Sequence, residues 1–272
     1  MNDLVIRAER PADYRKTEAM VRRSFWNIHG PGCNEHLLVR IIRDCGDYLP
    51  ELSRVAELDG QIVGAIFYTK ARVVDGDLES EIAAFGPLAV EPTLQNLGIG
   101  KRLLDETLPL AKMAGYPGLC IYGEPKYYPK RGFMTCDRFG ITNPEGKNFD
   151  ALMAYPLDDE AFSHIHGKLY ESAAFEACED ESALNEIEKE FPPYRKIKIQ
   201  EGFLQLYGRQ FATVQRAADG EYALSFWEQS LSAALSPDFF RQSTHAPRTG
   251  DTVLFSFGPA NRAVIESVIA PY

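Results

Sequence analysis

The sequence has few cysteines and no long apolar run, and each absence excludes a class of protein. Its five cysteines lie far apart and never form a C-x-x-C pair, so we expect neither a disulfide framework nor a zinc site, and we predict no metal. No segment approaches the roughly twenty consecutive apolar residues that span a membrane. Charged residues stand near the start of the chain, where a signal peptide would be apolar. We therefore expect a cytoplasmic protein with no membrane partner.

Acidic residues outnumber basic ones: the chain has 29 lysines and arginines and 39 aspartates and glutamates, so its net charge is −10. Binding to a nucleic-acid backbone needs a basic patch, so no nucleic-acid partner is predicted. An acidic surface suits a cationic, amine-bearing partner, although it also serves solubility. With 272 residues, 45% of them hydrophobic, the chain can form one large domain or one domain with a small second one.

Apolar runs and turn signals predict a mixed α/β domain. Strands are expected at 4–7, 55–58, 62–68, 81–90 and 119–122, and helices at 11–28 and 35–43. Asp59-Gly60 is a hairpin signal, because glycine accepts the positive φ of a two-residue turn. The sheet should therefore begin antiparallel, and the strand at 119–122 should run parallel to 81–90 after a helical crossover.

The most informative stretch is 87–104, which predicts an apolar strand, a loop and the start of a helix, with Gly98 and Gly100 at the N-terminus of that helix. A helix N-terminus leaves N–H groups without intrahelical partners and carries about half a positive charge, so it attracts anions. Glycines let a ligand approach the backbone closely. The pattern predicts a site for a phosphate-bearing ligand.

Two common phosphate-binding loops do not fit this stretch. A dinucleotide fingerprint would need a third glycine where Leu103 stands. A P-loop would need a glycine in place of Gln95 and a serine or threonine in place of Arg102. Nucleotide-binding folds of both kinds are therefore poor interpretations.

The remaining pattern, Q-x-x-G-x-G after Leu88-Ala89-Val90, resembles motif A of the GNAT (Gcn5-related) N-acetyltransferases. Residues 35–39, 85–90 and 127–133 are similar to one branch of that family, the predicted YhbS-like acetyltransferases. The resemblance covers about residues 1–200, and the last seventy or so residues resemble no family that we can name. It implies the GNAT fold, in which a mostly antiparallel twisted sheet is flanked by helices.

The resemblance also implies the co-substrate, acetyl-CoA, and the residues that hold it. Its pyrophosphate is expected on the loop and helix start, at Gln95, Asn96, Leu97, Gly98, Ile99, Gly100 and Lys101. Its pantetheine arm is expected between two strands that splay apart, on backbone groups of Leu88, Ala89 and Val90.

Acetyl transfer to an amine needs a neutral amine and a proton for the leaving thiolate. Tyr128 is the candidate acid, because its spacing to Gly132-Phe133 resembles the family's Y-x-x-x-G-F; the alternative is that it only packs helix against sheet. Glu81 and Glu35 are the candidate bases, and each is equally consistent with an ordinary surface or capping carboxylate. His36 is a further base or acceptor contact, or a structural histidine.

Three segments are predicted: a GNAT acyltransferase domain at 1–157, an acidic extension at 158–195 and a small α+β appendage at 196–272. In the appendage, strands are expected at 211–215, 222–227 and 252–257, and helices near 229–234 and 260–269. The appendage could cover the acceptor cleft, mediate a homodimer or bind another partner.

The function predicted from the sequence is an acetyl-CoA-dependent N-acyltransferase, in which an amine attacks the thioester directly in a ternary complex. The alternative is a non-catalytic acyl-CoA-binding or regulatory module of the same fold. The acceptor is left open between small-molecule and protein amines.

Overall fold

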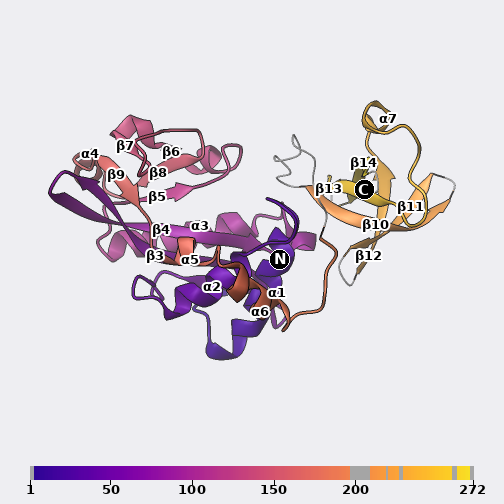
Figure 1. Cartoon of the computed structure of the whole chain (residues 1–272), viewed down its shortest axis with the longest axis horizontal. Coiled ribbons are helices and arrows are strands. Elements are labelled where there is room, and N and C mark those ends of the chain that lie inside the picture. The colour runs from indigo at the N-terminus through magenta and orange to yellow at the C-terminus, as the bar shows by residue number, and fades with distance from the viewer. Residues whose placement is uncertain (1–2, 197–208, 219, 227–228, 259–261, 270–272) are drawn as a thin grey trace. The chain divides into compact units, whose positions relative to one another are not determined.

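The computed structural model describes residues 3–196, 209–218, 220–226, 229–258 and 262–269 (Figure 1). The chain divides into two compact units. The first consists of residues 1–22, 34–90 and 99–193, and the second of residues 23–33, 91–98 and 194–272. Within the described residues, no helix is long and apolar enough to cross a membrane.

A mixed sheet flanked by helices forms the first unit, as predicted. Its main path is β1-β2-β3-β4-β5-β8-β6, with β9 paired to both β3 and β7. The strands are β1 (Val5–Arg7), β2 (Arg54–Leu58), β3 (Gln61–Asp75), β4 (Leu78–Val90), β5 (Gly118–Tyr122), β6 (Met134–Thr135), β7 (Ile141–Thr142), β8 (Leu152–Pro156) and β9 (Gly167–Tyr170). The helices are α1 (Tyr14–Phe25), α2 (Glu35–Asp44), α3 (Ile99–Met113), α4 (Asp159–Ser163), α5 (Ala174–Ala177) and α6 (Glu181–Glu188), with short 3₁₀ turns η1 (Pro11–Asp13), η3 (Tyr128–Arg131) and η4 (Cys136–Phe139). The last three residues of α1 and the 3₁₀ turn η2 (Pro92–Leu94) belong to the second unit.

The sheet changes direction where the sequence predicts. Strands β1 to β4 are antiparallel neighbours, and β5 returns parallel to β4 after the α3 crossover. In the described sheet, β4 and β5 pair only at Ala83 and Leu119. Beyond that position β4 continues to Val90 and β5 to Tyr122, so the two strands part in this region.

A bulge lies in the middle of the β3–β4 pair. Ile66 is opposite Leu88 and Tyr68 is opposite Phe85, so Gly86 and Pro87 together face the single residue Phe67. Such an insertion breaks the regular ladder and bends the strand. Strand β4 is therefore distorted at Gly86 and Pro87.

Residues after 157 add to the same sheet. Strand β9 pairs antiparallel with β3, where Tyr170 is opposite Arg72, and parallel with β7. Helices α5 and α6 lie against α2 (Figure 1). The acidic extension therefore completes the first unit.

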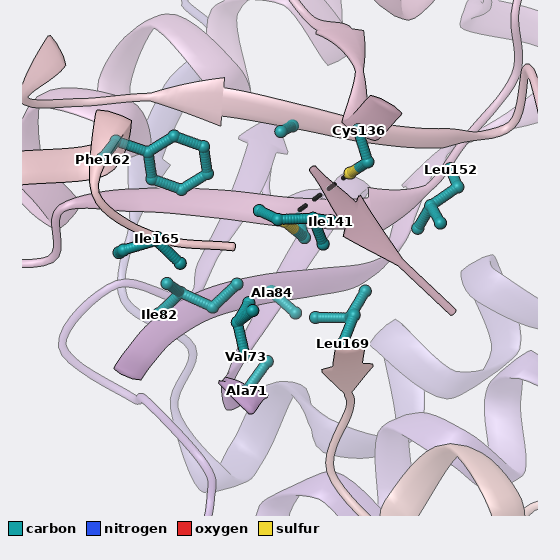
Figure 2. Packing of buried hydrophobic residues seen from close by; sticks show 12 residues of the cluster. Ala71, Val73, Ile82, Ala84, Cys136, Ile141, Leu152, Phe162, Ile165 and Leu169 are labelled. Atoms are coloured by element: carbon teal, nitrogen blue, oxygen red, sulfur yellow. Dashed lines mark hydrogen bonds between the residues drawn. The ribbon is translucent and has the colours of Figure 1, made fainter. Parts of the chain in front are cut away.

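A cluster of buried side chains joins the strands of the first unit, as Figure 2 shows. It includes Ala84 of β4, Leu169 of β9, and two free thiols, of which Cys136 Sγ donates a hydrogen bond to Cys120 Sγ at 3.8 Å. All five cysteines are free.

The second unit contains a closed barrel of β10 (Arg209–Ala218), β11 (Glu221–Phe226), β12 (Gln229–Leu235), β13 (Thr252–Phe257) and β14 (Ala263–Ile269), with α7 (Phe239–Gln242) between β12 and β13. The order around the barrel is β10-β11-β12-β14-β13, with β12 and β14 parallel. This is the order of an OB-type barrel, a fold that carries many functions and by itself indicates none. Phe226 and Phe255 pack edge to face in its core, 4.9 Å between ring centroids.

The prediction of helices near 229–234 and 260–269 is wrong, because residues 229–234 lie in β12 and residues 263–269 form β14. Residues 260–261 fall outside the described residues, and Arg262 precedes β14. The appendage is a β-barrel with one short helix. In β14 the buried side chains alternate, at Ala263, Ile265 and Ser267. That is the period of a strand, but apolar residues on both faces hide it in the sequence.

Candidate active site

The predicted cofactor loop leads directly into α3. Asn96 has a φ of 63° and Gly98 a φ of 87°, both in the left-handed region that Asn and Gly accept most readily. The chain reverses through these two residues, and α3 begins at Ile99, one residue after Gly98. The predicted geometry of a turn that opens a helix N-terminus is therefore present.

Helix α3 is fixed by its apolar face. Ile99 and Leu103 are buried, and a Cβ on Gly64 of β3 would lie 3.0 Å from Ile99 Cγ2. Glycine at this position therefore lets the first turn of α3 approach the sheet closely. Lys101 lies on the exposed face and pairs with Asp105 one turn later, as expected for a solvated face.

Tyr127 lies over that first turn. A Cβ on Gly100 would be 2.8 Å from the Tyr127 hydroxyl oxygen, so glycine is required for this contact. The Arg131 guanidinium stacks 3.6 Å from the Tyr127 ring centroid. Burial raises the pKa of the Tyr127 phenol and Arg131 opposes the rise, so the hydroxyl keeps its proton at neutral pH. Sequence reasoning gave Tyr127 no role beyond packing, although it stands beside the chosen Tyr128.

Tyr128 is buried on η3, with 6% of its surface exposed. Its ring packs against Phe85 of β4 and Phe133, at 5.8 and 5.2 Å between centroids. A Cβ on Gly123 would lie 2.4 Å from the Tyr128 ring, so Gly123 leaves the space that this ring fills. Tyr128 therefore stands beside β4 and the end of β5, where the two strands part.

Leu88, Ala89 and Val90 form the last part of β4. They pair with Ile66, Ala65 and Gly64 of β3. In the described sheet no β5 residue pairs with them, so their strand edge on that side faces the gap between β4 and β5. This is the edge to which the sequence analysis assigned the pantetheine amides.

Glu35 lies in the first turn of α2. Its carboxylate accepts the Asn34 N–H at 3.2 Å. Burial raises the Glu35 pKa to about 7, and the nearby Glu179 charge adds to this effect. The group can therefore exchange a proton near neutral pH.

Glu81 differs from Glu35 in its surroundings. It is 56% exposed, and one carboxylate oxygen lies 3.1 Å from Lys70 Nζ. An exposed pair of this kind contributes little to stability.

His36 is fully buried within the first unit. Its Nε2 lies 3.0 Å from Glu188 Oε1 of α6, and its ring meets Phe191 edge to face. Arg22, 1% exposed, donates from Nε and Nη2 to both Glu188 oxygens at 2.8 and 2.7 Å. These contacts tie α1, α2 and α6 together, which supports the structural interpretation of His36.

Comparison with known proteins identifies this arrangement. Residues 50–135 match the acetyltransferase (GNAT) domain. Two Escherichia coli K12 proteins, both named as uncharacterized N-acetyltransferases, are similar to the chain. YjhQ is 34% identical over 88 residues, 32% of this chain and 48% of YjhQ, so the chain matches about half of that relative. YhbS is 27% identical over 165 residues, 60% of this chain and 93% of YhbS.

Two solved structures share the fold. The YhbS acetyltransferase of E. coli, determined in complex with CoA, has a TM-score of 0.57 at 25% identity, covering 64% of this chain and 92% of its own. A GNAT family acetyltransferase from Brucella melitensis, determined with acetyl-CoA, has a TM-score of 0.50 at 26% identity, covering 63% and 97%. Residues 50–135 are thus similar to a GNAT acetyltransferase domain, and this match does not extend to the barrel.

Proposed function

We propose that this protein is an acetyl-CoA-dependent N-acetyltransferase. The observation that carries the proposal is the combination of the α3 N-terminus after Asn96 and Gly98 with the parting of β4 and β5. The similar proteins YhbS and the Brucella acetyltransferase, whose structures contain CoA and acetyl-CoA, support it.

Acetyl-CoA would bind across these elements. Residues Gln95 to Gly98 and the first turn of α3, Ile99 to Lys101, would hold the pyrophosphate through N–H groups and the helix dipole. The Tyr127 hydroxyl over Gly100 offers one more donor to that anion. Leu88 to Val90 would bind the pantetheine amides through their backbone groups.

The chemistry would be direct transfer in a ternary complex. A base takes one proton from the acceptor's ammonium, and the neutral nitrogen attacks the thioester carbonyl carbon. The C–S bond then breaks, its electron pair goes to sulfur, and Tyr128 protonates the thiolate. A phenol with a pKa of about 10 matches a thiolate in basicity. The nitrogen returns a proton to Tyr128 as the amide forms, so one proton in total reaches solvent.

The acceptor would be an amine on a small molecule or a protein, in keeping with the acidic surface. A cytoplasmic location, the absence of a nucleic-acid partner and a homodimer mediated by the appendage remain predictions. Glu35, with a pKa near neutrality, and the solvent-exposed Glu81 remain the base candidates offered by the sequence.

Thermal unfolding with and without acetyl-CoA tests the cofactor site. Ligand at a hundred times its dissociation constant adds about 2.7 kcal/mol of stability. Gly98→Ala should remove the shift, because a Cβ at positive φ strains the loop. Gly60→Ala is the matched control, since Gly60 also has a positive φ and open space around its Cβ position. If wild-type protein shows no shift, the proposed function is wrong.

Turnover separates an enzyme from a non-catalytic acyl-CoA-binding module of the same fold. Tyr128→Phe should lower kcat by about 10²-fold, the usual contribution of a positioned acid, while acetyl-CoA still raises Tm. Binding without acetylation of any amine by wild-type protein would favour the module instead.

A further inference from the structure

A third carboxylate, Glu171, has no assigned role so far. It follows β9 directly, two residues after Leu169, whose side chain is 1% exposed and packs with Ala84 of β4. Residues two apart along an extended chain share a face. Glu171 is therefore directed to the same side of the sheet as the cluster, and it is partly buried.

The segment after Glu171 is fixed over the middle of β4. A Cβ on Gly86, at the β4 bulge, would lie 3.0 Å from the Phe175 ring. On the other side, Ser172 Oγ donates to Asp47 at 2.8 Å. The chain from 171 to 175 thus reaches the point where β4 bends and parts from β5.

The charge of Glu171 acts on β5. It is the largest charge contribution to the raised pKa of Tyr122, which reaches about 12, after the effect of burial. It also contributes to the raised pKa of Cys120. The carboxylate therefore lies on the side of the sheet where β5 ends, near the gap that would receive the thioester.

Glu171 has no cation and no hydrogen-bond donor beside it in the described part of the chain, unlike Glu81 with Lys70 or Glu188 with Arg22. Asp47 lies beyond Ser172, and the Arg72 guanidinium is 5.8 Å from the neighbouring Tyr170 ring. Burial alone raises the Glu171 pKa to about 7. An unpaired, partly buried carboxylate is costly to keep ionised and gains from a cationic ligand.

We propose that Glu171 is the general base that receives the proton of the acceptor's ammonium, directly or through one water. This inference rests on the proposed acetyl transfer. One Glu171 oxygen forms the O–H bond as the acceptor's N–H bond breaks, and the proton leaves to solvent after the amide forms. Glu35 lies in a different place, beside Asn34, Cys178 and Glu179. Glu81 is paired with Lys70 at the surface. A general base in this position would suit an acceptor amine that arrives as a cation.

The test compares nucleophiles that do and do not need a base. CoA release from acetyl-CoA is followed by chromatography with spermidine, lysine methyl ester and kanamycin, and separately with hydroxylamine, which is uncharged at neutral pH. With whichever of the three amines the wild-type protein acetylates, Glu171→Gln should lower kcat by about 10²-fold or more. The variant should also lose the fall in kcat/KM that the wild-type protein shows below about pH 7. Its rate with hydroxylamine should stay within about twofold of wild type. Glu176→Gln, at an exposed position of α5, is the matched control.

Two results would overturn the inference: a Glu171→Gln rate with amines close to wild type, or an equal loss with hydroxylamine. Carboxyl ¹³C NMR of the wild-type protein measures the Glu171 pKa independently. This measurement decides the question if the variant fails to fold or if hydroxylamine is the only nucleophile that reacts. A Glu171 pKa near 7 supports the inference, and one near the ordinary value of about 4.3 overturns it. Wild-type protein that binds no acetyl-CoA, or releases no CoA with any nucleophile, refutes the proposed acetyl transfer itself.

Discussion

Replacing Glu188 by glutamine should destabilise the first unit strongly. Glu188 is 18% exposed and holds Arg22 and His36. Burial opposes its charge, but the hydrogen bonds from His36 and Arg22 prevail and lower its pKa from 4.5 to about 2. Each pKa unit is worth about 1.4 kcal/mol, so the shift corresponds to about 3 kcal/mol. Leaving Arg22 buried without its partner adds to this cost.

The effect has a defined pH dependence. A carboxylate whose pKa is lower in the folded state stabilises the fold above its unfolded pKa, and this contribution is lost as pH falls through the folded value. The difference between wild type and Glu188→Gln should thus be full above about pH 4.5 and shrink toward pH 2. Urea unfolding at pH 7, 4 and 3 measures it, and Tm should drop by about 6–12 °C at pH 7.

The control is Glu186→Gln on the same helix, an exposed residue that pairs with Lys189. It should change stability by less than about 0.5 kcal/mol. If Glu188→Gln behaves like this control, or if its effect does not vary between pH 7 and 3, the charge on Glu188 does not hold the extension to α1 and α2.

Three further predictions concern other parts of the chain. Gly123→Ala should lower kcat by about tenfold, because its Cβ would lie 2.4 Å from the Tyr128 ring and displace it; unchanged kinetics would mean that the position of Tyr128 is unimportant. Cys33 and Cys45 should react with a thiol reagent in native protein, whereas the buried Cys120 and Cys136 should react only after unfolding, as mass spectrometry of the labelled peptides can decide. Phe255→Ala should destabilise the barrel by about 3–5 kcal/mol, measured by urea unfolding. A loss of stability below about 1 kcal/mol would show that Phe255 is not packed in the barrel core as described.

The catalytic fold could be predicted because its signals are local. The Asp59-Gly60 turn, the strand ending in Leu88-Ala89-Val90 and the glycines before α3 each determine structure within a few residues. The barrel could not be predicted from the sequence, because β14 has apolar residues on both faces. The alternation of buried and less buried side chains along β14 becomes visible only in the structure.

Glu171 likewise could not be recognised as a site residue from the sequence. In the sequence it is one of 39 acidic residues, and no spacing sets it apart. Its surroundings come from β3, β4 and β5, which lie about fifty to a hundred residues earlier in the chain. Burial without a partner is a property of the tertiary structure, so only the folded chain reveals it.

The late position of β9 in the chain has a consequence for synthesis and for the choice of fragments. Strand β3 is complete at Asp75, but its edge at Arg72 to Val74 obtains a partner only when residues 168–170 have left the ribosome. Until then that edge is exposed to pairing with other chains. A fragment ending at 157 would keep the exposed edge permanently and should aggregate, whereas one ending at 193 retains β9, α5 and α6 and should remain monodisperse.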